Sequence, residues 1–386
     1  MSFQYISVKQ RRTRTKHKLI SLLRDQGFVY KKGVLKPKNY TKPSLRRLNN
    51  FSVNHLLLKN KEFIQKYDKH FILKYIANGN EIRPEEISPK LVCFDSKNKE
   101  ESNLFNWVKL HWSIPISAGY GRRLRYLVID EYNNKLIGII GLADPVYALK
   151  DRDSFIGWNS KTKANNLKHI MDGFVIGAVP PYNLILSGKL VSSLITSDKV
   201  AKDFRKKYHG KKSLISGKKF YGKLLAVTTS SAFGKSSMYD RIKIPDGPEF
   251  FHVGWTKGSG EFHFSNGEYK NLSMLAKKSG CSGKNSKWGT GPRNKRVVIR
   301  EALKKLGLPN DLLYHGIKRE LFLAPLVKNW KQLLLEENKN AKTLRNDVRY
   351  NASFMLNRWV IPRSERDETY KSFDNSSYSL FRKINR

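Results

Sequence analysis

The chain is long, strongly basic and rich in apolar side chains. It has 386 residues, of which 39% are hydrophobic and 12% aromatic. This is too long for one ordinary domain and apolar enough to build packed cores. The 74 Lys and Arg residues outnumber the 32 Asp and Glu residues, so the formal net charge is +42, which indicates a polyanionic partner. No stretch approaches the roughly 20 apolar residues that span a bilayer. We therefore predict a nucleic-acid partner, DNA rather than RNA, and no membrane.

The cysteines exclude two further classes of protein. Cys93 and Cys281 are the only cysteines, and one distant pair forms neither a Cys-rich zinc site nor a disulfide framework. We predict no cysteine-based metal site and a location in the reducing cytoplasm. The sequence does not identify a cofactor.

The N-terminal region, residues 1–100, is predicted to be basic and helical. Its first 50 residues contain 14 Lys and Arg but a single acid, Asp25. Residues 7–28 have the pattern of a basic helix that ends at Gly27, and residues 54–79 space their apolar residues at helical intervals. A basic arm can follow the phosphates of a nucleic acid. A solvated helix on a small helical domain would have the same pattern.

Residues 104–270 are predicted to form a mixed α/β core domain. Residues 124–145, LRYLVIDEYNNKLIGIIGLADP, are two β-rich runs joined by Asn133 and Asn134, which predicts a hairpin. Further strands are expected at 173–179 and 223–231, a long helix at 183–208 and a second hairpin at 249–265. The fold class is therefore α+β, with a central mixed sheet flanked by basic helical N- and C-terminal regions.

The last third of the chain is predicted to be helical and then peripheral. Residues 271–330 are a basic segment, and its run NKRVVIREALKKLGLPNDLLYHG predicts helix, turn and short helix. This pattern fits a helix-turn-helix reader of DNA, and equally an ordinary helical hairpin with a wet basic face. Residues 331–386 are polar, lysine-rich and weakly periodic, which predicts a peripheral tail.

A Gly-Lys-Ser triplet at 234–236 has the appearance of the end of a nucleotide-binding P-loop. That loop has the pattern GxxxxGK[ST], in which another glycine stands five positions before the glycine of the Gly-Lys pair. In this chain that position is occupied by Thr229. Because threonine resists the positive φ that glycine supplies, we do not predict ATP binding here.

The few carboxylates suggest a metal-dependent nuclease or strand-transfer enzyme as one alternative. Asp130, Asp144, Asp172 and Glu261 all lie near predicted strand ends and could converge on a hard cation. Asp130 and Asp144 are the tentative catalytic pair. The same residues could equally end turns or form local salt bridges.

The order of elements suggests another alternative, an enzyme of the GNAT-type acyltransferase fold that modifies nucleic acid or a nucleotide. In that fold a helix N-terminus holds the cofactor pyrophosphate, for which the candidates are Ser187, Gly188 and Lys189. A tyrosine after the next strand can act as general acid, and Tyr239 is the candidate. The usual Arg/Gln-x-x-Gly-x-Gly/Ala signature is absent, so a GNAT-like fold without cofactor fits as well.

Arginines beside tyrosines in GYGRRLRY, residues 119–126, are typical of base stacking and phosphate clamping. A soluble hairpin edge would look similar. Together with the basic arms they give the candidate nucleic-acid contacts: Arg11, Arg12, Arg14, Arg122, Arg123, Arg125, Lys235, Arg241, Arg293, Lys295 and Arg296.

Several long stretches resemble the DruA family of the Druantia anti-phage system. They are LHWSIPISAGYGRRLRYLVID (110–130), KLIGIIGLADPV (135–146), RDSFIGW (152–158), MDGFVIGAVPPYNLILSGKLVSSL (171–194), TTSSAFGKSSMYDRIK (228–243), GSGEFHF (258–264) and HGIKRELFLAPL (315–326). The resemblance implies a role in prokaryotic defence against phage beside a large helicase-like partner. It implies no settled chemistry, so no catalytic residue is carried over. We predict a nucleic-acid-binding defence component and leave catalysis open.

Overall fold

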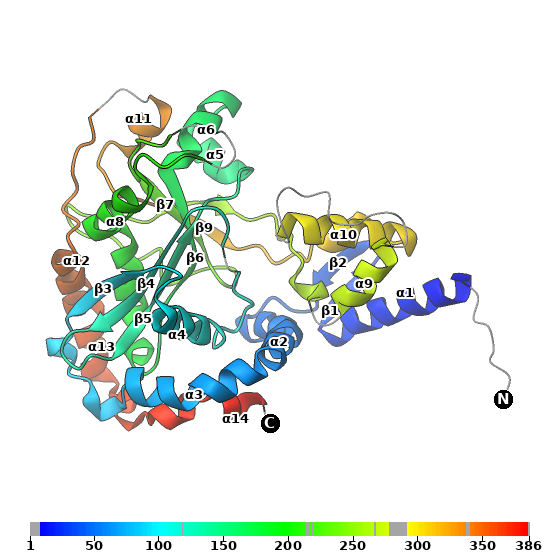
Figure 1. The fold of residues 1–386 in the computed structure, drawn as a ribbon, viewed down its shortest axis with the longest axis horizontal. Coiled ribbons are helices and arrows are strands. Elements are labelled where there is room, and N and C mark those ends of the chain that lie inside the picture. The colour runs from blue at the N-terminus through cyan, green and yellow to red at the C-terminus, as the bar shows by residue number, and fades with distance from the viewer. Residues whose placement is uncertain are drawn as a thin grey trace.

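The protein consists of a large lobe built on a β-sheet and a smaller lobe that carries the N-terminal helix (Figure 1). The structure is a computed structural model that describes residues 8–117, 119–213, 217, 219–265, 268–277, 292–336 and 340–384. None of the helices in these ranges is long and apolar enough to cross a membrane.

The large lobe is organised around a seven-stranded mixed sheet, which confirms the predicted α+β class. Only β6 and β7 pair in parallel, and every other neighbouring pair is antiparallel. In spatial order the strands are β3 (Pro89–Phe94), β4 (Arg123–Asp130), β5 (Leu136–Ala143), β6 (Ile170–Ala178), β7 (Ala226–Ser230), β9 (Glu320–Pro325) and β8 (Phe251–Trp255).

The predicted hairpin of residues 124–145 is present as β4 and β5. The turn between them places Asn134 at φ 57°, a left-handed conformation that asparagine tolerates well. Every residue of β5 is buried, as expected for an apolar strand covered on both faces. This hairpin lies between the edge strand β3 and the middle strand β6.

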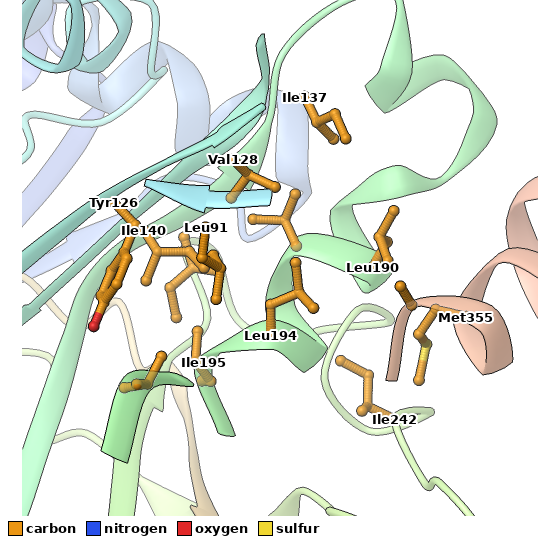
Figure 2. Packing of buried hydrophobic residues seen from close by; sticks show 14 of the residues in the cluster. Leu91, Tyr126, Val128, Ile137, Ile140, Leu190, Leu194, Ile195, Ile242 and Met355 are labelled. Carbon is orange, nitrogen blue, oxygen red and sulfur yellow. The ribbon is translucent and has the colours of Figure 1, made fainter. Parts of the chain in front are cut away.

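Helices cover both faces of the sheet. One face packs against α7 (Ser187–Ser193), α8 (Asp198–Tyr208) and α12 (Val348–Met355). Figure 2 shows this core, where Val128 and Ile140 of the sheet meet Leu190, Leu194 and Met355. On the opposite face, α3 (Lys61–Tyr75) and α4 (Lys99–Lys109) cover the half that contains β3 to β6. On this same face, α5 (Lys150–Ile156) and α11 (Trp330–Leu335) cover the half that contains β7, β9 and β8.

The small lobe combines elements from two distant parts of the chain (Figure 1). Its N-terminal part is α1 (Val8–Asp25), the hairpin of β1 (Phe28–Lys31) and β2 (Val34–Pro37), and the start of α2 (Lys42–Lys59). Its other part is α9 (Glu268–Lys277), α10 (Pro292–Lys305) and a 3-10 turn at Asn310–Leu313. The basic helix predicted to end at Gly27 is therefore present, with Gly27 at φ 101°. The short helix expected after α10 is this 3-10 turn.

Two local predictions in the large lobe are wrong. The helix expected at 183–208 is divided into a 3-10 turn at Tyr182–Ile185, α7, a second 3-10 turn at Leu194–Thr196, and α8. The hairpin expected at 249–265 is absent, because β8 pairs with β9 while residues 262–264 form a 3-10 turn. β9 carries buried apolar residues at nearly every position. It lies between β7 and β8, and it is the strand that pairs with β8 in place of the neighbouring residues that local turn signals suggested.

The C-terminal residues expected to form a peripheral tail contribute to the large lobe instead. Met355 and Val360 are fully buried in the core beneath the sheet, and Leu380 of α14 (Leu380–Ile384) is fully buried beside α3. The apolar residues of this segment are sparse, so their periodicity in sequence is weak even though each of them packs. The sheet also takes β3 and β9 from outside residues 104–270.

One buried carboxylate ties the C-terminus to the large lobe. Asp68 of α3 is 4% exposed and accepts a hydrogen bond from Nε1 of Trp107 at 2.7 Å. It also accepts bonds from Oγ of Ser379 at 2.6 Å and from the backbone N–H groups of Leu380 and Phe381 at 3.1 and 3.3 Å. Asp68 therefore accepts hydrogen bonds from backbone N–H groups in the first turn of α14, which have no acceptor within the helix.

We expect Asp68→Ala to lower the free energy of unfolding by about 3 kcal/mol, because several buried donors would lose a charged acceptor. Urea unfolding followed by circular dichroism measures this change. Glu365→Ala, at an exposed residue of α13 (Ile361–Arg366), is the control and should change stability by less than about 0.5 kcal/mol. Equal stability of the two variants would contradict the assigned role of Asp68.

Candidate nucleic-acid interface

The two most basic segments of the chain share one apolar core. Leu19 and Leu23 of α1 are buried together with Ile299 and Leu303 of α10, all at 2% exposure or less. Leu45, Leu48, Leu272, Leu306 and Leu312 complete this core. Neither segment is large enough to bury its apolar face alone. The packing therefore brings both sets of lysines and arginines onto one lobe.

Two acids, Glu268 and Glu261, form ion pairs near the places where elements of the small lobe meet. Lys18 of α1 forms an ion pair with Glu268 of α9 at 3.1 Å. Nε of Arg296 in α10 donates to Glu261 at 3.0 Å, while the ammonium of Lys295 lies 5.7 Å from the centre of the Tyr269 ring. Lys295 and Arg296, two of the candidate nucleic-acid contacts, thus also help to hold the small lobe together.

Other basic side chains of α1 point away from this core. Arg12 and Arg14 are exposed, and the structure gives their guanidinium groups no partner among the described residues. A hollow of about 690 Å³ runs along α1, and its lining includes Arg14, Lys16, Arg24 and Tyr30. The side chains of two further candidates, Arg11 and Arg293, lie outside the described residues. The exposed face of α1 can therefore offer several cations to one polyanion.

The arginine cluster at 122–125 divides into different roles. Arg122 is partly buried and engaged by the protein, because its Nε donates to Asp144 at 2.7 Å and its guanidinium lies 5.0 to 5.8 Å from the ring centres of Phe204, Tyr208 and Phe220. Arg123 is exposed. Arg125 lies 4.9 Å from the ring centre of Phe94, and burial lowers its pKa, as does the neighbouring Arg123. Of the three, Arg123 is the most accessible to a ligand.

The four candidate metal-binding carboxylates do not converge on one site, although Asp144 and Asp172 lie at the same end of the neighbouring strands β5 and β6. Asp130 ends β4 beside the hairpin turn, whereas Asp144 follows β5 at the opposite end of the same pair of strands. Asp130 accepts hydrogen bonds from Ser88 and Tyr182, and its burial raises its pKa. Asp172 accepts a bond from Thr228 at 2.7 Å. In the described part of the chain no three His, Cys, Asp or Glu residues form a group that could hold a metal ion.

The tentative acyltransferase residues are packed inside the large lobe. Tyr239 is 4% exposed and stacks on Phe250, with 5.7 Å between ring centres. Burial raises its pKa to about 12. At the start of α7, Ser187 is fully buried, and the space beside Gly188 is occupied by the sulfur of Met238. Lys189 donates to the backbone carbonyl of Ser237 at 2.6 Å.

Two histidines that stand between aromatic or apolar residues in the sequence, His252 and His263, have different surroundings. His252 of β8 is exposed, with its Nε2 4.0 Å from Oε1 of Glu320. His263 is fully buried, hydrogen bonded to the carbonyl of Leu312, and its pKa is lowered to about 4 by burial. Lys235 and Arg241, on either side of Tyr239, are exposed.

Comparison with known proteins decides the family. The family model of Druantia protein DruA matches residues 39–336. The Druantia protein DruA of Escherichia coli (strain UMEA 4076-1) is 36% identical over 371 residues, which cover 95% of this chain and 91% of that protein. The chain belongs to the Druantia protein DruA family. This confirms the resemblance seen in the sequence. No solved structure matches the chain.

Sequence reasoning missed basic residues of this DruA-family chain that lie outside the charge clusters. Lys257, Lys318 and Arg319 belong to the two segments that connect the lobes, and each stands in an otherwise apolar or Gly-rich context. The continuous apolar run LFLAP could have indicated a buried strand at 320–325. The proximity of Lys257 to Lys318 and Arg319 depends on contacts between residues about 60 positions apart, such as the hydrogen bond between Arg319 and Thr256.

We expect Arg122→Ala to lower the free energy of unfolding by about 2 kcal/mol, because it leaves a half-buried Asp144 carboxylate without its partner. Arg123→Ala, at the next residue, should stay within about 0.5 kcal/mol of the parent protein. Urea unfolding compares the two variants. Unchanged stability of Arg122→Ala with lost nucleic-acid binding would instead make Arg122 a ligand contact.

Proposed function

We propose that this protein is a nucleic-acid-binding component of a Druantia anti-phage system, with DNA as the preferred ligand. The observation that supports this most is the small lobe, where two basic segments are held on one core and the exposed Arg12 and Arg14 of α1 have no acidic partner among the described residues. Membership of the DruA family supports the defence role.

The charge balance of the small lobe favours a polyanion over a small ligand. Residues 1–50 hold 14 Lys and Arg against one acid, and residues 270–305 hold 11 against one. Placing so many like charges on one lobe is unfavourable unless counterions or a ligand neutralise them. A nucleic acid gains affinity from such a surface because its own condensed counterions are released on binding. The helicase-like partner implied by the resemblance belongs to the same proposal.

The purified protein should bind a fluorescent 20-base-pair DNA at about 50 mM NaCl, and affinity should fall steeply towards about 200 mM. The double variant Arg12→Ala/Arg14→Ala should weaken binding about tenfold and make the slope of log Kd against log salt shallower by about two. Fluorescence anisotropy measures both quantities, and an RNA of the same sequence tests the preference for DNA.

The matched control is Lys61→Ala/Lys69→Ala, which removes two exposed charges from α3 on the large lobe. It should leave affinity within about twofold of the parent protein. A chain that binds neither DNA nor RNA at about 50 mM NaCl would rule out the proposed function.

An acyltransferase-like activity on nucleic acid or a nucleotide is the second candidate, and the topology of the sheet favours it. The order of elements is a hairpin (β4–β5), a strand (β6), a helix (α7), a parallel strand (β7) and a turn that leads to Tyr239. This is the order expected for a GNAT-type fold. The buried Ser187 and the Met238 side chain over Gly188 would have to move to admit a cofactor.

If this second candidate is right, acetyl-CoA at about 1 mM should raise the melting temperature by several degrees, because a ligand that binds only the native state stabilises it. Tyr239→Phe should keep that shift and lose turnover, while Tyr132→Phe, at an exposed tyrosine, should change neither. Absence of a thermal shift with acyl-CoA donors would exclude this candidate.

A further inference from the structure

Arg319 stands where the two lobes join, and its guanidinium has no partner in the part of the chain that the structure describes. Its side chain is partly buried, yet no hydrogen bond, ion pair or ring contact of the guanidinium is present among the described residues. The backbone of Arg319 is fixed, because its N–H donates to Oγ1 of Thr256 at 3.0 Å and its carbonyl accepts from the N–H of Thr256 at 2.9 Å. The side chain therefore starts from a fixed backbone position, and its five N–H donors have no acceptor among the described residues.

Tertiary contacts bring three lysines to the same place. Gly234 forms a β-bridge with Arg319, which positions Lys235 beside it. Thr256 pairs with Arg319, which positions Lys257, and Lys318 is its neighbour in the chain. All three lysines are exposed, and none has an acidic partner in the described part of the chain. We call Lys235, Lys257, Lys318 and Arg319 the junction cations.

The backbone at the junction is closely packed, so these positions are well defined. A Cβ atom on Gly258 would lie 3.0 Å from the carbonyl carbon of Gly316, and Gly258 has φ 66°. The N–H of Gly316 donates to the carbonyl of Gly258 at 3.1 Å. Two chain segments therefore cross between the lobes side by side and carry the junction cations on a fixed framework.

The neighbouring carboxylates have other partners. Glu320 accepts from the backbone N–H of Ser236 at 2.6 Å and has His252 4.0 Å away. Glu261 pairs with Arg296, and Asp151 accepts from the N–H of Trp255 at 2.7 Å. None of these pairs includes a junction cation. Burial without a compensating acid lowers the pKa of Arg319, and Arg319 in turn helps to lower the pKa of the buried His315, after burial and His263.

We propose that the junction cations bind a phosphate group, supplied by the backbone of a nucleic acid that extends from the small lobe towards the sheet. This inference rests on the proposed function. A partly buried guanidinium without an acceptor is unfavourable, and a phosphate offers the paired oxygens that match its planar fork. A free nucleotide or inorganic phosphate presents the same chemistry. We favour the nucleic acid because the exposed lysines extend the positive charge beyond a single group.

The site gives the Gly-Lys-Ser triplet a role other than that of a P-loop. Gly234 at φ 56° turns the chain towards Arg319, so that Lys235 joins the junction cations. The N–H of Ser236 is already bonded to Glu320 and does not contribute to a phosphate cradle. The anion is thus held by side chains from three segments, whereas a P-loop holds it by consecutive backbone amides.

The test compares Arg319→Gln with Arg366→Gln, a matched change at an exposed arginine of α13 far from the junction (Figure 1). Anisotropy with a fluorescent 20-nucleotide single strand and its duplex gives Kd at several salt concentrations. We expect Arg319→Gln to raise Kd about tenfold and to make the salt slope shallower by about one. Its ligand-free melting temperature should equal or exceed that of the parent, because an uncompensated charge is removed. Arg366→Gln should match the parent in both measurements.

A second variant keeps the inference testable if Arg319→Gln fails to fold. Lys235→Gln/Lys257→Gln/Lys318→Gln changes only exposed side chains and should weaken binding at least tenfold. Parent-like affinity of Arg319→Gln, or of this triple variant where the first is unfolded, would overturn the inference while leaving the proposed function intact.

A thermal-shift measurement with inorganic pyrophosphate separates the two sources of phosphate. If the parent protein binds no nucleic acid, the proposed function is wrong. The thermal shift with pyrophosphate then decides whether the junction cations bind phosphate at all. A shift in the parent that is lost in Arg319→Gln would support a site for a free phosphate compound. Absence of a shift in such a parent would overturn the junction site as well.

Discussion

The architecture of this protein depends on one packing constraint, the shared apolar core of the small lobe. Leu19 and Leu23 near the N-terminus are buried in one cluster with Ile299 and Leu303, about 280 residues later in the chain. Their burial is favourable by roughly 2 kcal/mol per side chain. It also forces two segments of the same charge onto one body, where they repel each other. The hydrophobic contact therefore creates the positive surface, and a polyanion is the natural means of relieving it.

The large lobe uses its buried polar groups in a different way, mostly to hold its own structure. Asp68 binds the start of α14, Asp130 binds the loop before β3 and Tyr182, and Arg122 pairs with Asp144 under three aromatic rings. A buried charge of this kind is stable because each acceptor or donor has a partner. Against this background the absence of a described partner for the Arg319 guanidinium is informative.

Sequence patterns located most strands correctly and misjudged how some of them pair. The β4–β5 hairpin followed from two β-rich runs and an Asn-Asn turn, since all of its information is local. The partner of β8 could not be inferred, because β9 lies about 65 residues later and local glycines imitated a hairpin. Residues 183–208 were predicted as one helix from their periodicity. The segment is divided by the αL conformation at Leu186 and by two 3-10 turns. These breaks are too short to disturb the spacing of the apolar residues, so the sequence does not reveal them.

The sequence by itself determined the strong positive charge, the α+β fold class and the DruA family, because charge, local periodicity and long motifs are properties of consecutive residues. Only the tertiary structure decided which basic side chains are available to a ligand. Arg122 and Arg123 are adjacent in the chain, yet one is partly buried beside Asp144 and the other is exposed. Lys235, Lys257 and Arg319 are distant in the chain and meet at the lobe junction. Burial and pairing depend on what packs against each side chain, and that information is distributed over the whole chain.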